Sequence, residues 1–239
     1  KGPNIIAAQV MNWGIDRSYG IISYRTAFLC QGHTQKESFL NSGYDGNWKV
    51  YHNKAVYEKP VDWIFGGQIV GGFYAGNPTD SIVAAEYPWG WKGLEFDDSD
   101  WKDPGVVFSR PKTNAGAGHG WIMQARTTAM QELEREDIGR IIRVSGESGE
   151  DIKGLSAQVI GENQDVKILI DKGYVTLGYP VLTVTGGKDA VVRVKYSEAL
   201  YDEENRKGNR NVHRGKAIKG ISDVYVCDGG EERSFQPLW

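Results

Sequence analysis

Cysteine is scarce in this sequence of 239 residues, which contains only Cys30 and Cys227. The two lie far apart in the chain, so we expect them in different domains as small buried side chains in strands, with a disulfide between them as the alternative. No cysteine and histidine stand at a spacing that suits zinc, and the four histidines include no i, i+4 pair. The sequence therefore predicts no metal site.

Long apolar runs and an excess of one charge are also lacking. No stretch approaches the roughly 18 apolar residues of a membrane-spanning helix, and no signal peptide is recognisable. The 28 basic and 31 acidic residues nearly balance, which argues against nucleic acid or a membrane surface as the main partner. With 40% hydrophobic residues, the chain can form a packed core in two sandwich domains or one large one.

Signatures of catalysis are absent too. There is no Gly-x-Ser-x-Gly elbow and no His-Glu-x-x-His motif. Ala115–Gly120 (AGAGHG) lacks the flanking strand, helix and Gly-Lys-Ser/Thr of a phosphate loop, so we interpret it as a flexible loop. The acidic cluster Asp202, Glu203 and Glu204 lies in a polar stretch that predicts a solvated hairpin tip without raised pKa values. We therefore predict no catalytic residue and no cofactor, and we leave calcium open as an unsupported alternative.

Glycine and aromatic residues, in contrast, are plentiful: there are 31 glycines, and aromatic residues make up 11%. Short runs that alternate apolar and polar residues, separated by turns such as Gly186-Gly187 and Gly229-Gly230, predict an antiparallel β-sandwich in the second half. In the run at Val191, we expect Val192, Val194 and Tyr196 to face the core. The expected strands are Ile141–Val144, Leu155–Ile160, Val166–Ile170, Val175–Thr185, Val191–Leu200, Ser222–Cys227 and Ser234–Trp239.

The first half is expected to form another all-β domain. Its predicted strands are Lys1–Trp13, Tyr19–Cys30, Lys36–Leu40, Asn47–Tyr57 and Trp121–Ala125. One short helix is predicted at Asp80–Glu86, with Thr79 or Asp80 as its N-cap. The charged run Thr127–Asp137 is read as a linker helix or an extended crossover, which places the boundary between domains 1–126 and 127–239.

Two aromatic motifs of the first half each allow a structural and a functional interpretation. In Phe96–Trp101 (FDDSDW), Asp97, Asp98 and Ser99 suit a tight turn that Trp101 covers, and the alternative is a calcium or sugar ligand from Asp97 or Asp98. Trp89 and Trp91 would share a face on a strand, but the neighbouring Pro88 and Gly90 also suit a turn. Their rings are either core filling or a platform for a sugar.

A polar insertion of about two dozen residues separates the expected strands Val191–Leu200 and Ser222–Cys227, and this length is unusual unless the insertion is functional or disordered. It contains the loop Asn205–Arg214 (NRKGNRNVHR). Arg206, Arg210 and Arg214, with Asn209 and Asn211, supply many hydrogen-bond donors. Three interpretations stay open: a solvent loop, a surface that docks on another domain through charge-assisted bonds, and direct contact with sugar hydroxyls. Asn209, Arg210, Asn211, Trp89 and Trp91 are therefore the candidate ligand-binding residues.

The C-terminal part of the chain resembles bacterial α-L-rhamnosidases of glycoside hydrolase family 78, in the β-sandwich that precedes their catalytic domain. The resemblance rests on the strings KYSEALYDEENRKGNRN and DVYVCDGGEERSFQPLW. Further similar motifs follow the family order upstream: Asn47–Tyr51 (NWKVY), Tyr87–Trp91 (YPWGW), Phe96–Trp101 and Tyr174–Gly187 (YVTLGYPVLTVTGG). The long C-terminal string is the most specific of these.

This resemblance implies an all-β chain of two antiparallel β-sandwich domains of the galactose-binding or jelly-roll-like kind, the first without its early strands. It implies that both ends continue, that an inverting pair of carboxyl groups lies on an (α/α) barrel after Trp239, and that this chain alone has no turnover. It further implies a bacterial parent enzyme, exported to the periplasm or secreted, that cleaves terminal α-L-rhamnosides. The alternative function is an autonomous module that binds rhamnose-containing carbohydrate.

Overall fold

The computed structural model describes residues 2–12, 14, 26–43, 46–59, 79–106, 126–146, 152 and 154–238. The chain divides into two compact units. One comprises Lys1–Val56 and Glu86–Gln131, and the other comprises Tyr57–Ala85 and Glu132–Trp239. Among the described residues, no helix has the length and apolar character needed to cross a membrane.

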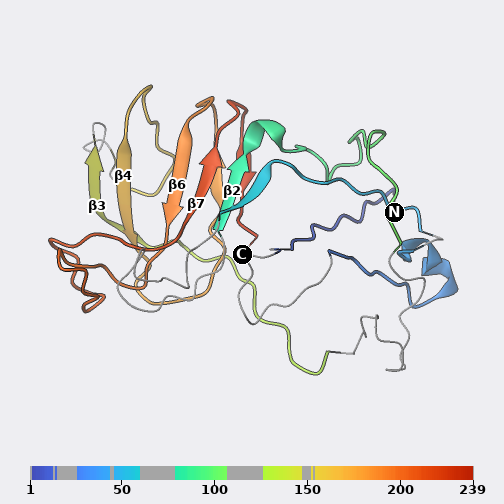
Figure 1. The fold of residues 1–239 in the computed structure, drawn as a ribbon, viewed down its shortest axis with the longest axis horizontal. Helices are drawn as coiled ribbons and strands as arrows, with labels where there is room; N and C mark the ends of the chain where they lie inside the picture. The colour runs from blue at the N-terminus through green and yellow to red at the C-terminus, as the bar shows by residue number, and fades with distance from the viewer. Residues whose placement is uncertain are drawn as a thin grey trace. The chain divides into compact units, whose positions relative to one another are not determined.

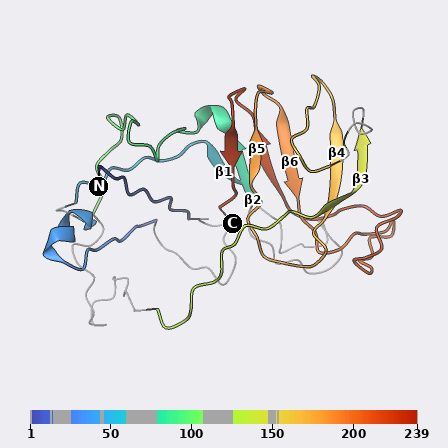
Figure 2. The same cartoon turned by 180° about the vertical axis from the view of Figure 1, so that it is seen from behind.

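The regular elements are β-strands and short 3₁₀ helices (Figures 1 and 2). The strands are β1 (Val56–Lys59), β2 (Thr79–Val83), β3 (Arg140–Gly146), β4 (Val166–Asp171), β5 (Leu182–Val184), β6 (Val191–Lys195), β7 (Ser222–Val226) and β8 (Arg233–Phe235). The described residues include the 3₁₀ helices η2 (Gln35–Leu40) and η3 (Ala84–Glu86). The predicted all-β class is thereby confirmed.

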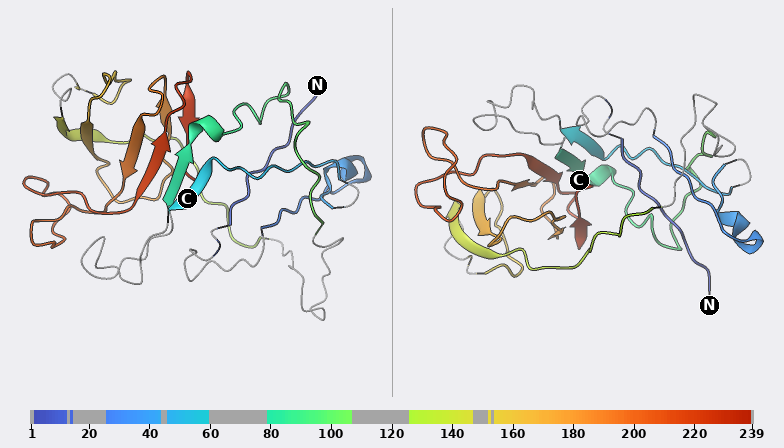
Figure 3. Two further views of the ribbon diagram at one scale, coloured as in Figure 1. Left: turned by 45° about the horizontal axis from the view of Figure 1, so that its top comes forward. Right: turned by 90° about the horizontal axis from the view of Figure 1, so that it is seen from below.

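The largest sheet has the strand order β1-β2-β7-β6, and its strands stand side by side in Figure 3. β6 and β7 pair antiparallel from Val191–Val226 to Lys195–Ser222. β2 joins β7 in parallel, with Ser81 opposite Val224, an arrangement that the antiparallel prediction did not include. Two antiparallel ladders, β3–β4 and β5–β8, complete the strand pairing of the described chain.

The core of this unit centres on β7. Tyr225 is 1% exposed, and its ring stacks on Phe235 of β8 with centroids 5.5 Å apart. The β5–β8 ladder therefore packs on one face of the four-stranded sheet. On β6, Val192 and Val194 are half-buried and Arg193 is exposed, as the period of two predicted.

The helix predicted at Asp80–Glu86 is wrong. Residues Thr79–Val83 form strand β2, and only Ala84–Glu86 form a single 3₁₀ turn. Ile82 lies opposite Tyr225, and the β-branched Ile82 and Val83 suit a strand that has a partner. Asp80 is buried and caps no helix. The pairing with β7 outweighs the weak local preference for a helix.

Other strand predictions are also corrected. Lys36–Leu40 lies in η2, whose capping box joins Thr34 and Glu37. In the described chain, residues 155–160 and 175–181 carry no strand, and residues 2–12 and 26–30 carry none either. Residues 127–137 contain no helix, so the linker-helix alternative is wrong. The predictions for Ala115–Gly120, Trp121–Ala125 and most of Tyr19–Cys30 fall outside the described residues.

Candidate functional site

The polar insertion between β6 and β7 is anchored by a short buried segment. Ala199, Leu200 and Tyr201 are buried, with exposed fractions of 7%, 8% and 5%. Tyr201 and Ala217 exchange two backbone hydrogen bonds of 2.9 Å, so the two ends of the insertion are held together. The apolar residues of the insertion therefore fix its base, and its charged residues stay at the surface.

The acidic cluster at the start of the insertion forms an exposed turn. The Arg206 backbone N–H donates to Asp202 Oδ1 over 2.8 Å, and the Arg206 guanidinium pairs with Asp202 and Glu204 at 3.0 and 2.9 Å. These donors, the backbone N–H first, hold the pKa of Asp202 below its usual value. The prediction that Asp202 is not a raised-pKa acid is confirmed.

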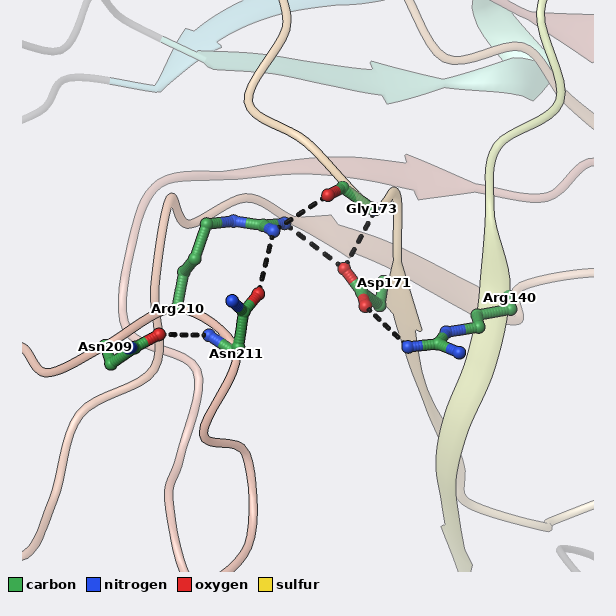
Figure 4. A network of polar contacts seen from close by, with 6 residues as sticks. All are labelled: Arg140, Asp171, Gly173, Asn209, Arg210 and Asn211. Carbon is green, nitrogen blue, oxygen red and sulfur yellow. Dashed lines mark hydrogen bonds and ion pairs between the residues drawn. The ribbon is translucent and has the colours of Figure 1, made fainter.

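Arg210 connects the insertion to the end of β4 (Figure 4). Its Nη1 donates to the carbonyl oxygen of Gly173 over 2.8 Å, and its Nη2 lies 3.2 Å from Asp171 Oδ1. Arg140 of β3 reaches the other carboxylate oxygen of Asp171 over 3.4 Å. Arg210 thus has its partners within its own unit, an arrangement that none of the three sequence interpretations included.

Asp171 is held as a carboxylate by this arrangement. The backbone N–H of Gly173 donates to Asp171 Oδ1 over 2.9 Å, and together with the Arg140 and Arg210 guanidinium groups it keeps the pKa of Asp171 below the usual range. Local sequence predicts the short turn from Asp171 to Gly173. Local sequence gives no indication that Arg210, so far along the chain, forms an ion pair with Asp171.

Two further contacts shape the outer face of this network. The Asn211 backbone N–H donates to Asn209 Oδ1 over 2.9 Å, and Arg210 Nη1 donates to Asn211 Oδ1 over 3.2 Å. Asn209 and Asn211 are exposed, and the Arg140 side chain is 79% exposed. The structure therefore brings Asn209, Arg210 and Asn211 together with Arg140, in a surface with amide and guanidinium donors that suit oxygen-rich ligands.

A second arginine ties the insertion to β3. Both terminal nitrogens of Arg143 donate to the carbonyl oxygen of Lys216, each over 3.0 Å. With Arg210, this contact fixes the insertion to both strands of the β3–β4 ladder. These contacts hold the insertion in a defined position against the β3–β4 ladder.

Trp89 and Trp91 lie in the other unit, on the turn after η3 and not on a strand. Both are half-buried. Trp89 packs on the Tyr87 ring with centroids 4.6 Å apart, and Trp91 Nε1 donates to Tyr87 Oη over 3.2 Å. Lys92 Nζ lies 5.2 Å from the centre of the Trp91 ring. Their role as sugar platforms stays a prediction.

The FDDSDW motif forms the turn that its residues predict. The Ser99 N–H donates to Asp97 Oδ1 over 3.0 Å, and the Trp101 N–H donates to the Asp98 carbonyl oxygen over the same distance. The Trp101 ring meets Phe96 edge-on at 5.6 Å. Within the described residues, no group of three or more histidine, cysteine, aspartate or glutamate side chains could hold a metal ion.

Sequence reasoning missed a buried polar cluster on the four-stranded sheet. Asp80 and Asp223 are 4% and 2% exposed, and burial raises the pKa of both carboxyl groups. Tyr196 donates its hydroxyl to Asp223. The one available signal was an aspartate inside an otherwise β-branched and aromatic run, at Asp223 in SDVYV.

Comparison with protein families gives a match for the C-terminal part of the chain. Residues 161–239 match the model of the bacterial α-L-rhamnosidase concanavalin-like domain. The matched range contains β4 to β8, the polar insertion and Arg210 with its partner Asp171. The comparisons with curated proteins and with solved structures return no match.

Proposed function

We propose that this chain is the supporting β-sandwich portion of a glycoside hydrolase that cleaves terminal α-L-rhamnosides, because residues 161–239 match the model of the bacterial α-L-rhamnosidase concanavalin-like domain. In this proposal the parent enzyme is bacterial and inverting, is periplasmic or secreted, and has its catalytic carboxyl groups on an (α/α) barrel outside these residues. The partners of the chain are that barrel and, through it, rhamnose-containing carbohydrate.

The observation that carries the supporting role is the burial of the carboxyl groups whose pKa is raised. An inverting glycosidase needs a raised-pKa acid and a base on opposite sides of a sugar, with room for water. In the described part of the chain, the carboxyl groups with a raised pKa are Asp80 and Asp223. Both are almost completely buried and in direct hydrogen-bonded contact with the backbone, so a sugar ring has no access to them.

The Arg210 network supports the same role. Arg143 and Arg210 hold the insertion on the β3–β4 ladder, and the exposed Asn209, Asn211 and Arg140 are left to face outward. An ordered polar surface of this kind suits charge-assisted contact with a neighbouring domain. Trp89 and Trp91 pack on other aromatic rings, which favours core filling over a role as a free platform for a sugar.

Two measurements test the proposal. The 239-residue chain should show no hydrolysis of an aryl α-L-rhamnoside above the buffer rate, and turnover by the purified chain would refute the non-catalytic role. Calorimetric titration of the same sample with rhamnose should give no binding heat. Saturable binding that is lost in the Trp89→Ala or Trp91→Ala variant would instead establish the autonomous carbohydrate-binding module.

A further inference from the structure

The polar insertion concentrates positive charge in a chain that is negative overall. Residues 205–220 contain six basic side chains and no aspartate or glutamate, whereas the formal net charge of the whole chain is −3. The six are Arg206, Lys207, Arg210, Arg214, Lys216 and Lys219. The first three have carboxylate partners, and the last three form no ion pair within the described part of the chain.

An irregularity in β3 adds two arginines to this surface. Ile141 and Arg143 lie opposite consecutive residues of β4, so Ile142 is an extra residue in the strand. Such a bulge changes the alternation of side chains between the two faces of a strand. Ile141 and Ile142 are both half-buried, and Arg140 and Arg143 are both exposed. The bulge therefore places two arginines that are three positions apart on the same exposed face.

Both arginines contact the insertion or its partner. Arg140 shares the carboxylate of Asp171 with Arg210 (Figure 4), and the terminal nitrogens of Arg143 donate to the Lys216 carbonyl oxygen. A guanidinium group has five N–H donors, so Arg140 and Arg143 both keep donors beyond these contacts. The bulged strand and the insertion thus contribute guanidinium donors to one surface.

The two asparagines of the insertion add donors and not acceptors. Asn209 Oδ1 accepts the Asn211 backbone N–H, and Asn211 Oδ1 accepts Arg210 Nη1, so both amide oxygens are occupied. Both side chains are exposed, and neither amide nitrogen donates to a described residue. A surface whose remaining polar groups are donors fits a ligand that is rich in acceptor oxygens, and a guanidinium fork matches a carboxylate.

We propose that this surface binds an acidic polysaccharide through the carboxylate groups of its uronic acid units. The surface, here called the donor face, comprises Arg140, Arg143, Asn209, Asn211, Arg214 and Lys216. In addition to supporting a catalytic domain, the chain then attaches to a charged carbohydrate polymer. The carboxylates accept from the guanidinium groups, and the sugar hydroxyls and ring oxygens accept from the amide nitrogens.

The choice of carbohydrate over another polyanion rests on the proposed function, in which the chain works next to rhamnose-containing carbohydrate. The net charge of −3 also disfavours long contact with the densely charged backbone of nucleic acid. The acids that follow β3 in the sequence, Glu147, Glu150 and Asp151, are outside the described residues. The proposal therefore depends on the placement of the donors and not on a count of charges.

The test is affinity electrophoresis of the 239-residue chain in gels that contain polygalacturonate, at low ionic strength. Fully methyl-esterified polygalacturonate is the matched control, because it has the same sugar backbone without free carboxylates. The free acid should retard the chain, the ester should not, and added salt should weaken the retardation.

Two double variants locate the binding surface. Arg140→Gln with Arg214→Gln removes two exposed guanidinium groups of the donor face and should weaken binding about threefold to tenfold. Arg193→Gln with Lys195→Gln removes two exposed charges of β6 and changes the net charge equally, so it should keep the affinity. Denaturant unfolding checks that both variants fold, and mobility in polymer-free gels corrects for their changed charge.

The proposal is overturned if polygalacturonate does not retard the chain, if the ester retards it equally, or if both double variants lose the same affinity. Equal affinity for poly-L-glutamate or for duplex DNA would overturn the assignment to carbohydrate. None of these results changes the supporting role, because hydrolysis of an aryl α-L-rhamnoside tests that role separately.

Discussion

Replacing Arg210 with alanine should destabilise the chain by about 1 kcal/mol, and by at most about 2. Hydrogen bonds from a charged donor in a buried site contribute about 1.5–3 kcal/mol each, and the contacts of Arg210 with β4 and the turn after it go to Asp171 and Gly173. Two observations reduce this value. The Arg210 and Asp171 side chains are 32% and 25% exposed, so solvent screens the pair. Arg210 Nε is buried and has no hydrogen-bond partner among the described residues.

The assay is equilibrium denaturation of purified variants, with the slope against denaturant checked for constancy. Arg210→Lys keeps the charge but loses the planar fork that reaches both partners, so it should recover only part of the loss. Arg214→Ala removes an exposed arginine of the same insertion and should change stability by less than about 0.5 kcal/mol. A double-mutant cycle of Arg210→Ala with Asp171→Asn then isolates their mutual contribution.

The reasoning fails if Arg210→Ala and Arg214→Ala have the same stability as the unsubstituted chain, because the insertion would then be a solvent loop. A protein that includes the catalytic domain allows a second test, of whether Arg210 acts within its own unit or on the barrel and the sugar. A loss of rhamnoside hydrolysis with unchanged stability would mean that Arg210 acts on the barrel or the sugar and not on β4.

Two further predictions concern the core and the response to acid. Phe235→Ala should lower the free energy of unfolding by about 3–4 kcal/mol, because it leaves a cavity at a side chain that is 5% exposed and removes the stack on Tyr225. Denaturant unfolding measures this loss. A loss below about 1 kcal/mol would mean that the β5–β8 ladder is not packed on the sheet at this point. The pKa of Asp171 is lowered, first by the Gly173 N–H, so its stabilisation is present above the unfolded-state value and is lost as the pH falls through the folded-state value. Asp171→Asn should therefore lower stability at neutral pH and flatten the curve below about pH 4, and an equally steep acid decline in this variant would contradict the assignment.

The strands of the second half were predictable where the local pattern and the tertiary environment agree. Val192 and Val194 alternate with charged residues, and both lie on the half-buried face of β6. The run Ser222–Val226 is rich in β-branched residues and forms β7. The sequence could not place β2, because the strand character of Thr79–Val83 comes from its pairing with β7, far along the chain.

The candidate site was predictable in composition but not in geometry. The donor-rich sequence around Arg210 marked the insertion, yet its partner Asp171 lies 39 positions earlier and carries no local sign of the contact. Asp80 was assigned to a helix cap because aspartate before a short apolar run favours one. Its burial depends on Asp223 and Leu238, which are 143 and 158 positions away.

The parallel contact of β2 with β7 also bears on how this chain reaches its folded state. Residues so distant in sequence must meet before β7 gains its second neighbour, and such closure is entropically costly and slow. Until then, β7 presents an open row of backbone groups to any other chain in solution. A polypeptide trimmed to the boundaries of the family match would lack β2 permanently, so that the exposed edge, and with it a tendency to aggregate, would persist in its final form.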